Sequence, residues 1–414
     1  MLIFFDNKNI VIHLCQQNYC QMENWIAPIT IAGDAATGLK YFKRPIINEN
    51  FWHEVKKGNH ILFVAPRRVG KSSVMKDLVL DCPEGYYCIY QDIEGVKTKD
   101  EFYQRLFELI MSCVSKIDKA KTLLNTWRKK YSITEITTSG IKIDKNTIDY
   151  EIEVRNSIPQ LKDLKINVVL FLDEFAEVIN KLSKKGNSDD AVAILHTIRE
   201  MRHDENFRHF TLVFAGSIGL HHVVKSIDRP KIINDLHEIK IGELTTKEAE
   251  QMINQLTKDA TVQYSEDDIV FLTGKIKNLL PYYIQLMLEE IDFIARNKNN
   301  PKINQQVINE AFENVSKKGS NFDDWIERLK IYLPKHYPFI NNLLTHCAHH
   351  NEIVIQKIYD IASKKIYKRT EDYMDFVDQL ITDGYWEEVT KHKYRFLSPF
   401  LQAFWLHKNP IYND

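Results

Sequence analysis

The most chemically informative part of this sequence is one short run of consecutive residues, Ala65-Pro66-Arg67-Arg68-Val69-Gly70-Lys71-Ser72-Ser73. It matches the pattern G-x-x-x-x-G-K-S/T, except that Ala65 takes the place of the first glycine. In this pattern the backbone N–H groups of the loop surround a phosphate, and the helix that follows points its positive end toward it. We therefore expect all of these residues to lie against the phosphates of a bound nucleotide.

Individual positions in this loop have distinct chemical roles. Gly70 has no Cβ, so the backbone can turn and approach a phosphate closely. Lys71 supplies a mobile positive charge for the β- and γ-phosphates, and the hydroxyl of Ser72 is a ligand for Mg²⁺. Ala65 is tolerated at the end of the preceding strand if its φ is negative. The alternative interpretation is an ordinary strand, turn and helix with a surface lysine.

A second motif downstream argues against that alternative. The apolar run Val168–Leu172 ends in two carboxylates, Asp173 and Glu174. Such a run is typical of a strand buried on both faces of a parallel sheet, and ligands of open α/β sheets bind at the carboxyl ends of the strands. Asp173 is expected to hold Mg²⁺, directly or through water, and Glu174 to polarise the attacking water. The alternative is a strand capped by solvated acids, but together the two motifs predict a P-loop nucleotide-binding protein.

The elements that must position these residues follow from the spacing of apolar residues. Short apolar runs predict strands over 61–64, 86–90, 168–172 and 211–217. Helical spacing predicts helices over 74–80, 100–116 and 151–164. The predicted fold class is α/β, a P-loop NTPase with a parallel sheet flanked by helices.

The predicted secondary structure changes at Gly242. After this residue we expect helices without strands until a hairpin near the C-terminus. Thr245 and Glu248 have the spacing of a capping box, and Pro281 stands near a helix N-terminus, where proline is favoured. Three helical segments followed by a hairpin have the order of a winged helix. The expected boundaries are an N-terminal extension over 1–40, a P-loop ATPase domain over 41–241 with an inserted hairpin at about 124–150, an all-α lid domain over 242–320 and a winged-helix-like domain over 321–414.

Net charge, cysteine spacing and the length of apolar runs bear on which classes of protein this chain can belong to. The chain has 414 residues and a formal net charge of -1. It therefore lacks the overall excess of positive charge that is typical of nucleic-acid-binding proteins. Its six cysteines lack metal-site spacing and are expected to be reduced thiols in a cytoplasmic protein. No apolar run has the length of a membrane span, and residues 1–21 do not have the pattern of a signal peptide.

With these motifs the chain resembles the archaeal-type ATPases of the STAND/AAA+ P-loop group, relatives of the archaeal replication-origin initiators with a C-terminal winged helix. The resemblance covers about residues 30–408 and rests on Pro66 to Ser73, Asp173-Glu174, Gly216-Ser217, Pro281 to Tyr283, and Phe396 to Trp405. One departure is Lys43-Arg44-Pro45, where the family has Gly-Arg-Glu before the first helix. The resemblance implies ATP and Mg²⁺ as cofactors.

The resemblance also implies roles for residues outside the two motifs. Ser217, at the sensor-1 position, is expected to bond the attacking water or the γ-phosphate; otherwise it only ends a strand. Pro281 packs on adenine or merely begins a helix. Asp92 orients Glu174 or is a surface acid. The loop arginines face phosphate or a neighbouring subunit, or are solvated. The catalytic candidates are therefore Glu174, Lys71, Asp173 and Ser217, and the metal-ligand candidates are Ser72 and Asp173.

Two functions remain open at this level. The first is a slow ATPase that hydrolyses ATP to ADP and phosphate and acts as a nucleotide-dependent switch, with a protein partner or self-association. The second is a DNA-binding regulator with structural nucleotide and negligible turnover. The predicted third helix of the winged helix, 371–383, is acidic and would set carboxylates against DNA phosphates. It therefore disfavours DNA binding, and the complete set of site carboxylates favours the ATPase.

Overall fold

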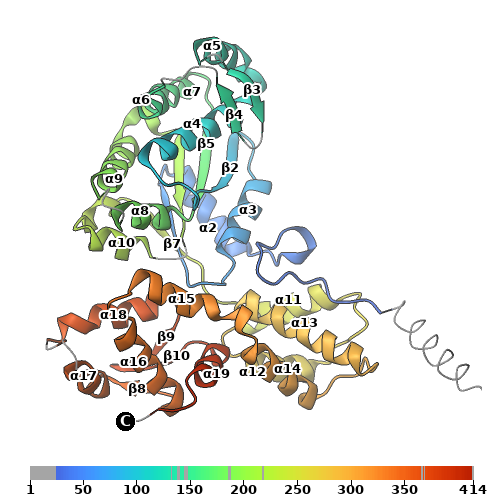
Figure 1. Cartoon of the computed structure of the whole chain (residues 1–414). Coiled ribbons are helices and arrows are strands. Elements are labelled where there is room, and N and C mark those ends of the chain that lie inside the picture. The colour runs from blue at the N-terminus through green and yellow to red at the C-terminus, as the bar shows by residue number, and fades with distance from the viewer. Residues whose placement is uncertain are drawn as a thin grey trace, which may run out of the picture. The chain divides into compact units, whose positions relative to one another are not determined.

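The computed structural model describes residues 25–131, 133–137, 140–143, 148–184, 188–216, 219–364, 367 and 369–412. By its contacts the chain divides into two compact units. We call the first, Lys43–Arg67 with Lys71–Gly242, the sheet unit. The second, which we call the helical unit, comprises the chain up to Phe42, Arg68–Gly70 and Glu243–Asp414. Figure 1 shows the elements of both.

The sheet unit is built on a parallel sheet whose strand order is β2-β5-β6-β1-β7. Every neighbouring pair in it runs parallel, so the carboxyl ends of its strands share one edge. The strands are β1 (Ile61–Val64), β2 (Tyr86–Asp92), β5 (Asn167–Asp173), β6 (Phe210–Phe214) and β7 (His237–Lys240). A separate antiparallel pair is formed by β3 (Ile133–Thr137) and β4 (Gly140–Ile143).

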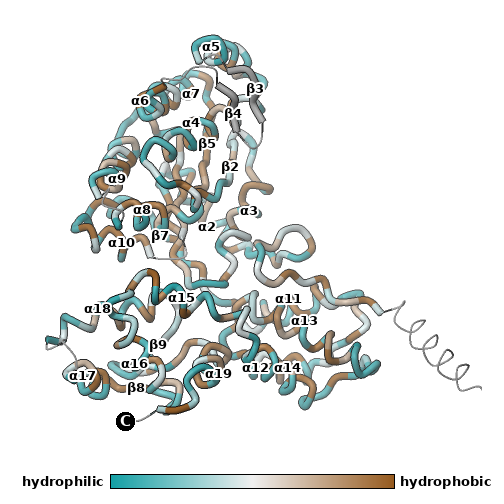
Figure 2. Tube along the Cα trace, in the orientation of Figure 1, coloured by the Kyte–Doolittle hydropathy of each residue, from teal (hydrophilic) through white to brown (hydrophobic). Residues whose placement is uncertain are grey.

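The predicted strand that ends in Asp173 is confirmed as the buried β5. All of its residues after Asn167 are buried, because β2 and β6 pair with it on either side and helices cover its faces. Phe51 of the helix α2 (Pro45–Lys56) stacks on Phe63 of β1 and on Phe171 of β5, with ring centroids 5.8 and 5.4 Å apart. The apolar residues of β1 and β5 are buried, and Figure 2 colours the chain by hydropathy. The continuous apolar run thus reflects burial on both faces.

Helices flank this sheet in the order that the sequence predicts for a P-loop NTPase. Their bounds are α2 (Pro45–Lys56), α3 (Lys71–Leu80), α4 (Lys99–Ser115), α5 (Lys121–Tyr131), α6 (Tyr150–Ser157), α7 (Pro159–Asp163), α8 (Phe175–Lys184), α9 (Ser188–His203) and α10 (Leu220–Ser226). The prediction of a single helix over 151–164 is wrong. Pro159 has no backbone N–H to continue the hydrogen-bond ladder of α6, so it begins α7 instead.

His60 lies directly before β1 and ties that strand to its neighbour. The backbone N–H of Leu212 in β6 donates a 3.0 Å hydrogen bond to Nδ1 of His60, so this nitrogen must be unprotonated. Burial, reinforced by the positive charge of Arg202 and opposed by Asp235, lowers the pKa of His60 from 6.5 to about 4. The unfolded chain therefore takes up this proton at a higher pH than the folded chain does.

We expect the free energy of unfolding to fall as the pH drops from about 6.5 toward 4, because only the unfolded His60 is protonated in this window. The contribution is fully present above about pH 6.5 and is at most about 3 kcal/mol. His60→Asn keeps an acceptor for Leu212 but cannot titrate, so its stability should depend less on pH. Urea unfolding at several pH values measures this, with His53→Asn at an exposed histidine of α2 as control. Identical pH profiles for wild type and His60→Asn would contradict the prediction.

The helical unit begins with a group of helices that follow one another along the chain. They are α11 (Thr246–Thr257), α12 (Glu266–Ile276), α13 (Pro281–Asn297) and α14 (Gln305–Lys317). The predicted capping box of Thr245 and Glu248 is confirmed, since each accepts a hydrogen bond from the other's backbone N–H. Ser265 and Asp268 form a second capping box that begins α12. Pro281 is the first residue of α13, as its position in the sequence predicts.

The rest of the helical unit combines helices with a small antiparallel sheet of order β8-β10-β9. Its elements are α15 (Asp323–Tyr332), α16 (Tyr337–His350), β8 (Ile353–Val354), α17 (Ile355–Ser363), α18 (Glu371–Thr382), β9 (Trp386–Thr390), β10 (Lys393–Phe396) and α19 (Pro399–Lys408). Between residue 321 and the β9–β10 hairpin, the described chain has four helices, α15 to α18, where three were expected. Leu333 precedes a proline and leaves the helical region, with φ -128° and ψ 48°, so α15 and α16 are separate.

An extended N-terminal segment packs on the helices of this unit. The N–H of Ile29 donates to the carbonyl of Leu256, and the N–H of Thr261 donates to the carbonyl of Ile26, both at 2.8 Å. The indole of Trp25 donates to the buried carboxylate of Asp292 at 2.9 Å. These bonds attach residues 25–29 to the surfaces of α11 and α13. Among the helices of the described residues, none has the length and apolar character needed to cross a bilayer.

Candidate functional site

The predicted phosphate loop occupies the turn between the end of β1 at Val64 and the start of α3 at Lys71. Two of its residues adopt left-handed backbone conformations, Arg68 with φ 65° and Gly70 with φ 93°. Gly70 takes this conformation without steric cost, whereas Arg68 does so with a Cβ. Left-handed residues within a turn redirect successive N–H groups into a concavity that suits an anion.

Lys71 lies at the N-terminus of α3 with its side chain folded back over the loop. Its ammonium donates a 3.3 Å hydrogen bond to the carbonyl of Ala65, and the residue is only 8% exposed. A cation buried to this degree needs partners of opposite charge or polarity. Because the positive end of the helix dipole is in the same place, an anion bound at this loop would interact favourably with both.

The structure brings Ser72 of α3 and Asp173 of β5 into direct contact. The Ser72 hydroxyl donates a 2.6 Å hydrogen bond to Oδ2 of Asp173, and the N–H of Glu174 donates to Oδ1 at 3.1 Å. Asp173 is 2% exposed. Two hard oxygen donors from separate elements therefore converge, which is the donor chemistry that Mg²⁺ requires. The residues present fit the ion that the sequence predicts.

The electrostatic environment of Asp173 also suits a cation. Burial raises the pKa of this carboxyl above its ordinary value, and the neighbouring charge of Glu174 raises it further. The hydrogen bonds from Ser72 and Tyr90 and the charge of Lys71 act in the opposite direction. The ionised carboxylate is thus disfavoured by desolvation, and a divalent cation beside it would offset that penalty.

Glu174 has a strained backbone. Its φ is 61°, a left-handed conformation that costs a residue with a Cβ about 1–2 kcal/mol. The turn at Glu174 ends β5 and lets α8 begin at Phe175, whose N–H donates to the carbonyl of Ala215 at 3.0 Å. Strain of this kind persists where the surrounding structure imposes it, and it is concentrated at functional sites.

One residue that contacts Asp173 lies outside both sequence motifs. The hydroxyl of Tyr90 in β2 donates a 2.8 Å hydrogen bond to Oδ2 of Asp173. Asp92, for which the resemblance implied either a role toward Glu174 or a place on the surface, is exposed, and its carboxylate accepts a 2.8 Å hydrogen bond from the N–H of Glu94. Its role toward Glu174 stays a prediction. A tyrosine two residues before the strand end was the available signal, because residues i and i+2 share a face.

Arg68 of the phosphate loop contacts two side chains, and its expected role toward phosphate or a neighbouring subunit stays a prediction. Within the helical unit, its guanidinium donates a 3.0 Å hydrogen bond to the carboxylate of Asp324. It also lies over the ring of Tyr282, 4.4 Å from the ring centroid. Arg68 is therefore held by an ion pair and a cation–π contact. A phosphate role for Arg67 stays a prediction.

The remaining predicted site residues are not tested by these contacts. Ser217 lies outside the described residues. Pro281 is partly exposed at the start of α13, and its packing on adenine stays a prediction. Pro66, Val69 and Ser73 lie in the loop and the first turn of α3, where the motif places them, with Val69 and Ser73 buried.

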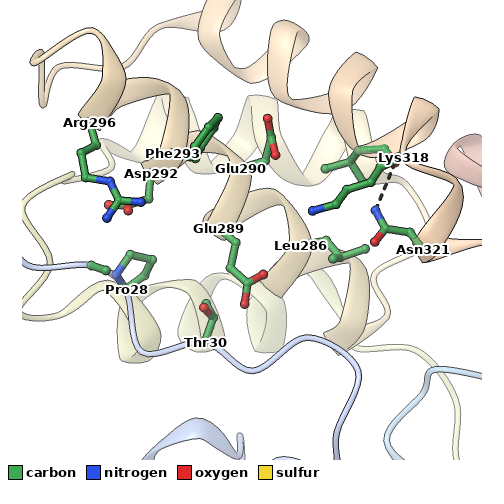
Figure 3. Close-up of a pocket in the computed structure, with 12 residues that line it drawn as sticks. Pro28, Thr30, Leu286, Glu289, Glu290, Asp292, Phe293, Arg296, Lys318 and Asn321 are labelled. Atoms are coloured by element: carbon green, nitrogen blue, oxygen red, sulfur yellow. Dashed lines mark hydrogen bonds between the residues drawn. The ribbon is translucent and has the colours of Figure 1, made fainter.

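Figure 3 shows a separate pocket in the helical unit, with a volume of about 370 Å³. Pro28 and Thr30 of the N-terminal segment and Phe293 of α13 line it together with charged side chains such as Glu289 and Lys318. None of the site residues predicted from the sequence is among its described lining residues. This pocket is therefore a different place from the group formed by Ser72, Tyr90 and Asp173.

No protein-family model and no curated protein matches the sequence. Solved structures do resemble it. The Walker-type ATPase PABY2304 of Pyrococcus abyssi superposes with a TM-score of 0.63 at 14% identity, covering 88% of this chain and 96% of that one. The Aeropyrum pernix ORC2 protein gives 0.52 at 12% identity, covering 88% and 92%.

These likenesses define the class of fold. At such low identity they bear on the fold alone, and together with the parallel sheet and the loop after β1 they show a P-loop NTPase fold followed by a helical C-terminal region. The fold class predicted from the sequence is confirmed at this level.

Proposed function

We propose that this chain is a magnesium-dependent ATPase that acts as a nucleotide-dependent conformational switch. The observation that carries the proposal is the 2.6 Å hydrogen bond between Ser72 and Asp173, which lie 101 positions apart in the sequence. It joins the two motifs that the sequence assigns to phosphate and metal binding. Lys71 and Glu174 are the chain neighbours of these two residues.

Each of these side chains has a defined task in the proposed reaction. Lys71 and the loop N–H groups hold the β- and γ-phosphates, and Ser72 and Asp173 hold Mg²⁺. When bound, Mg²⁺ neutralises charge that develops on the phosphates. Glu174 accepts a proton from the attacking water, and Ser217 orients that water or the γ-phosphate. Hydrolysis is expected to be slow, as suits a switch rather than a metabolic enzyme.

The comparisons support this choice among nucleotide chemistries. The similar protein of Pyrococcus abyssi is described as a Walker-type ATPase, and the Aeropyrum pernix ORC2 structure contains ADPNP-ADP complexes. ATP and ADP are thus the ligands we propose here. We also propose the domain boundaries given above, with a lid over 242–320 whose Pro281 packs on adenine and an ATPase domain over 41–241.

We further propose that residues 321–414 form a winged helix of the AAA+/STAND kind. The order α16, β8, α17, α18, β9, β10 supports this, since helices and a hairpin alternate as they do in that motif. The exposed positions of α18 include four carboxylates: Glu371, Asp372, Asp375 and Asp378. In the β9–β10 hairpin, Lys393 is paired with Glu352 and Arg395 with Glu387.

This distribution of charge favours a protein partner or self-association over DNA. Docking α18 in a major groove would place its carboxylates near phosphates, and the paired cations of the hairpin would first have to give up their partners. We therefore propose a cytoplasmic protein whose C-terminal domain engages protein surfaces.

Phosphate release by the purified full-length protein tests the proposed function. We expect slow release that requires both ATP and Mg²⁺, is abolished by EDTA, and is not accelerated by duplex DNA. The same assay with Lys56→Ala, at an exposed lysine of α2, should give the wild-type rate. Tight duplex binding without turnover would instead support the DNA-binding regulator with structural nucleotide.

A further inference from the structure

Tyr90 contacts the carboxylate at the centre of the site, yet neither sequence motif includes it. Its hydroxyl donates to Oδ2 of Asp173 at 2.8 Å, and the same oxygen accepts the hydrogen bond from Ser72 at 2.6 Å. Because Asp173 is 2% exposed, its orientation is decided by protein donors of this kind. Tyr90 is therefore one of the groups that determine where Oδ2 points.

The register of the sheet explains why a tyrosine can make this contact. Tyr90 pairs with Phe171 in the neighbouring strand, and Asp92 pairs with Asp173. Tyr90 and Asp92 share a face of β2, so Tyr90 stands diagonally to Asp173, at a separation of about 8 Å between backbones. The phenol ring and hydroxyl span this diagonal, whereas a shorter side chain would not reach.

The ring of Tyr90 is itself held in place from the phosphate-loop helix. The ammonium of Lys76 lies 5.3 Å from its ring centroid. Lys76 is four residues after Ser72 in α3, so both side chains project from the same face of that helix.

We infer that Tyr90 is a positioning residue whose hydroxyl orients Asp173 for Mg²⁺ in the nucleotide complex. This inference rests on the nucleotide site proposed above. When the Ser72 oxygen is committed to the metal, Tyr90 remains as a donor that fixes the buried carboxylate. Outer partners of metal ligands typically contribute about 10- to 100-fold to metal affinity. Losing the Tyr90 hydroxyl should therefore weaken the magnesium-dependent part of nucleotide binding and spare the magnesium-free part.

The test compares full-length wild type, Tyr90→Phe and Tyr87→Phe by titration with a fluorescent ADP analogue. Affinity is measured first in EDTA and then at stepwise concentrations of Mg²⁺. Tyr87 lies in the same strand at an odd spacing from Tyr90, so its side chain is on the opposite face and serves as the matched control. We expect the Mg²⁺ midpoint of Tyr90→Phe to rise about tenfold or more. Its affinity in EDTA, and both values for Tyr87→Phe, should equal those of wild type.

The other possible outcomes contradict either the role of Tyr90 alone or the nucleotide site as a whole. A wild-type Mg²⁺ midpoint in Tyr90→Phe overturns the positioning role and leaves the nucleotide site standing. Weaker binding by Tyr90→Phe in EDTA as well as in Mg²⁺ overturns it too, because the hydroxyl would then support the fold of the site in general. A wild-type chain that binds no nucleotide in either condition overturns the proposed function together with the inference.

Discussion

Replacing Lys71 with Ala should greatly weaken ATP binding. The ammonium is buried at the N-terminus of α3 and bonded to the carbonyl of Ala65, so it is the cation best placed to meet the β- and γ-phosphates. A hydrogen bond to a charged group contributes about 1.5–3 kcal/mol, so we expect the affinity to fall by roughly one to two orders of magnitude. Isothermal titration calorimetry with ATP and Mg²⁺ measures this directly.

Two further variants separate the charge of Lys71 from the volume of its side chain. Lys71→Met keeps most of the buried stem and removes only the ammonium, so it should lose affinity as Lys71→Ala does while unfolding at the wild-type denaturant concentration. Lys56→Ala removes an exposed lysine of the same unit and should bind normally. Unchanged affinity in Lys71→Met would remove Lys71 from the site.

The phosphate loop and the buried strand β5 could be predicted because their chemistry is local in the sequence. Gly70, Lys71 and Ser72 are adjacent in the sequence. The buried strand β5 is recognisable from an unbroken apolar run that ends in Asp173. The capping box at Thr245 is equally local, since its two residues are three positions apart. In each case one short window contains all the residues that the physical argument needs.

What the sequence did not predict depends on partners that are distant along the chain. Tyr90 gains its role only through the register that sets Asp92 opposite Asp173, and that register cannot be read from β2 alone. The partners of Arg68, Tyr282 and Asp324, are likewise remote in the sequence. Pro159 is the opposite case: its missing N–H is a local signal, and the helix over 151–164 should have been divided there.

The left-handed backbone conformations of Arg68 and Glu174 could not be predicted from the residue types either. Arg68 and Glu174 both have positive φ, although glycine is the residue that adopts this region at least cost. Each position nevertheless has a residue with a Cβ. At Arg68 the guanidinium makes an ion pair and a cation–π contact. At Glu174 we propose that catalysis is the reason.

Glu174→Gln should bind ATP nearly as wild type does but turn it over far more slowly. The substitution keeps the shape of the side chain and leaves Asp173 and Ser72 in place to hold Mg²⁺. It removes the carboxylate that we propose accepts a proton from water, and loss of a general base typically lowers the rate by about 10²–10⁴-fold. Calorimetry for binding and phosphate release for turnover, measured on the same preparation, check both halves of this expectation.

A second substitution at this position tests whether the strain at Glu174 is maintained for catalysis. Glu174→Gly removes the carboxylate and also relieves the left-handed conformation at φ 61°, so it should be inactive yet at least as stable as wild type toward urea. Glu174→Gln retains the Cβ and should match wild type in stability. If both variants hydrolyse ATP at the wild-type rate, Glu174 is a bystander and another group must activate the water. If Glu174→Gly is instead less stable than Glu174→Gln, contacts of the side chain, and not catalysis, explain why a strained residue stands at the end of β5.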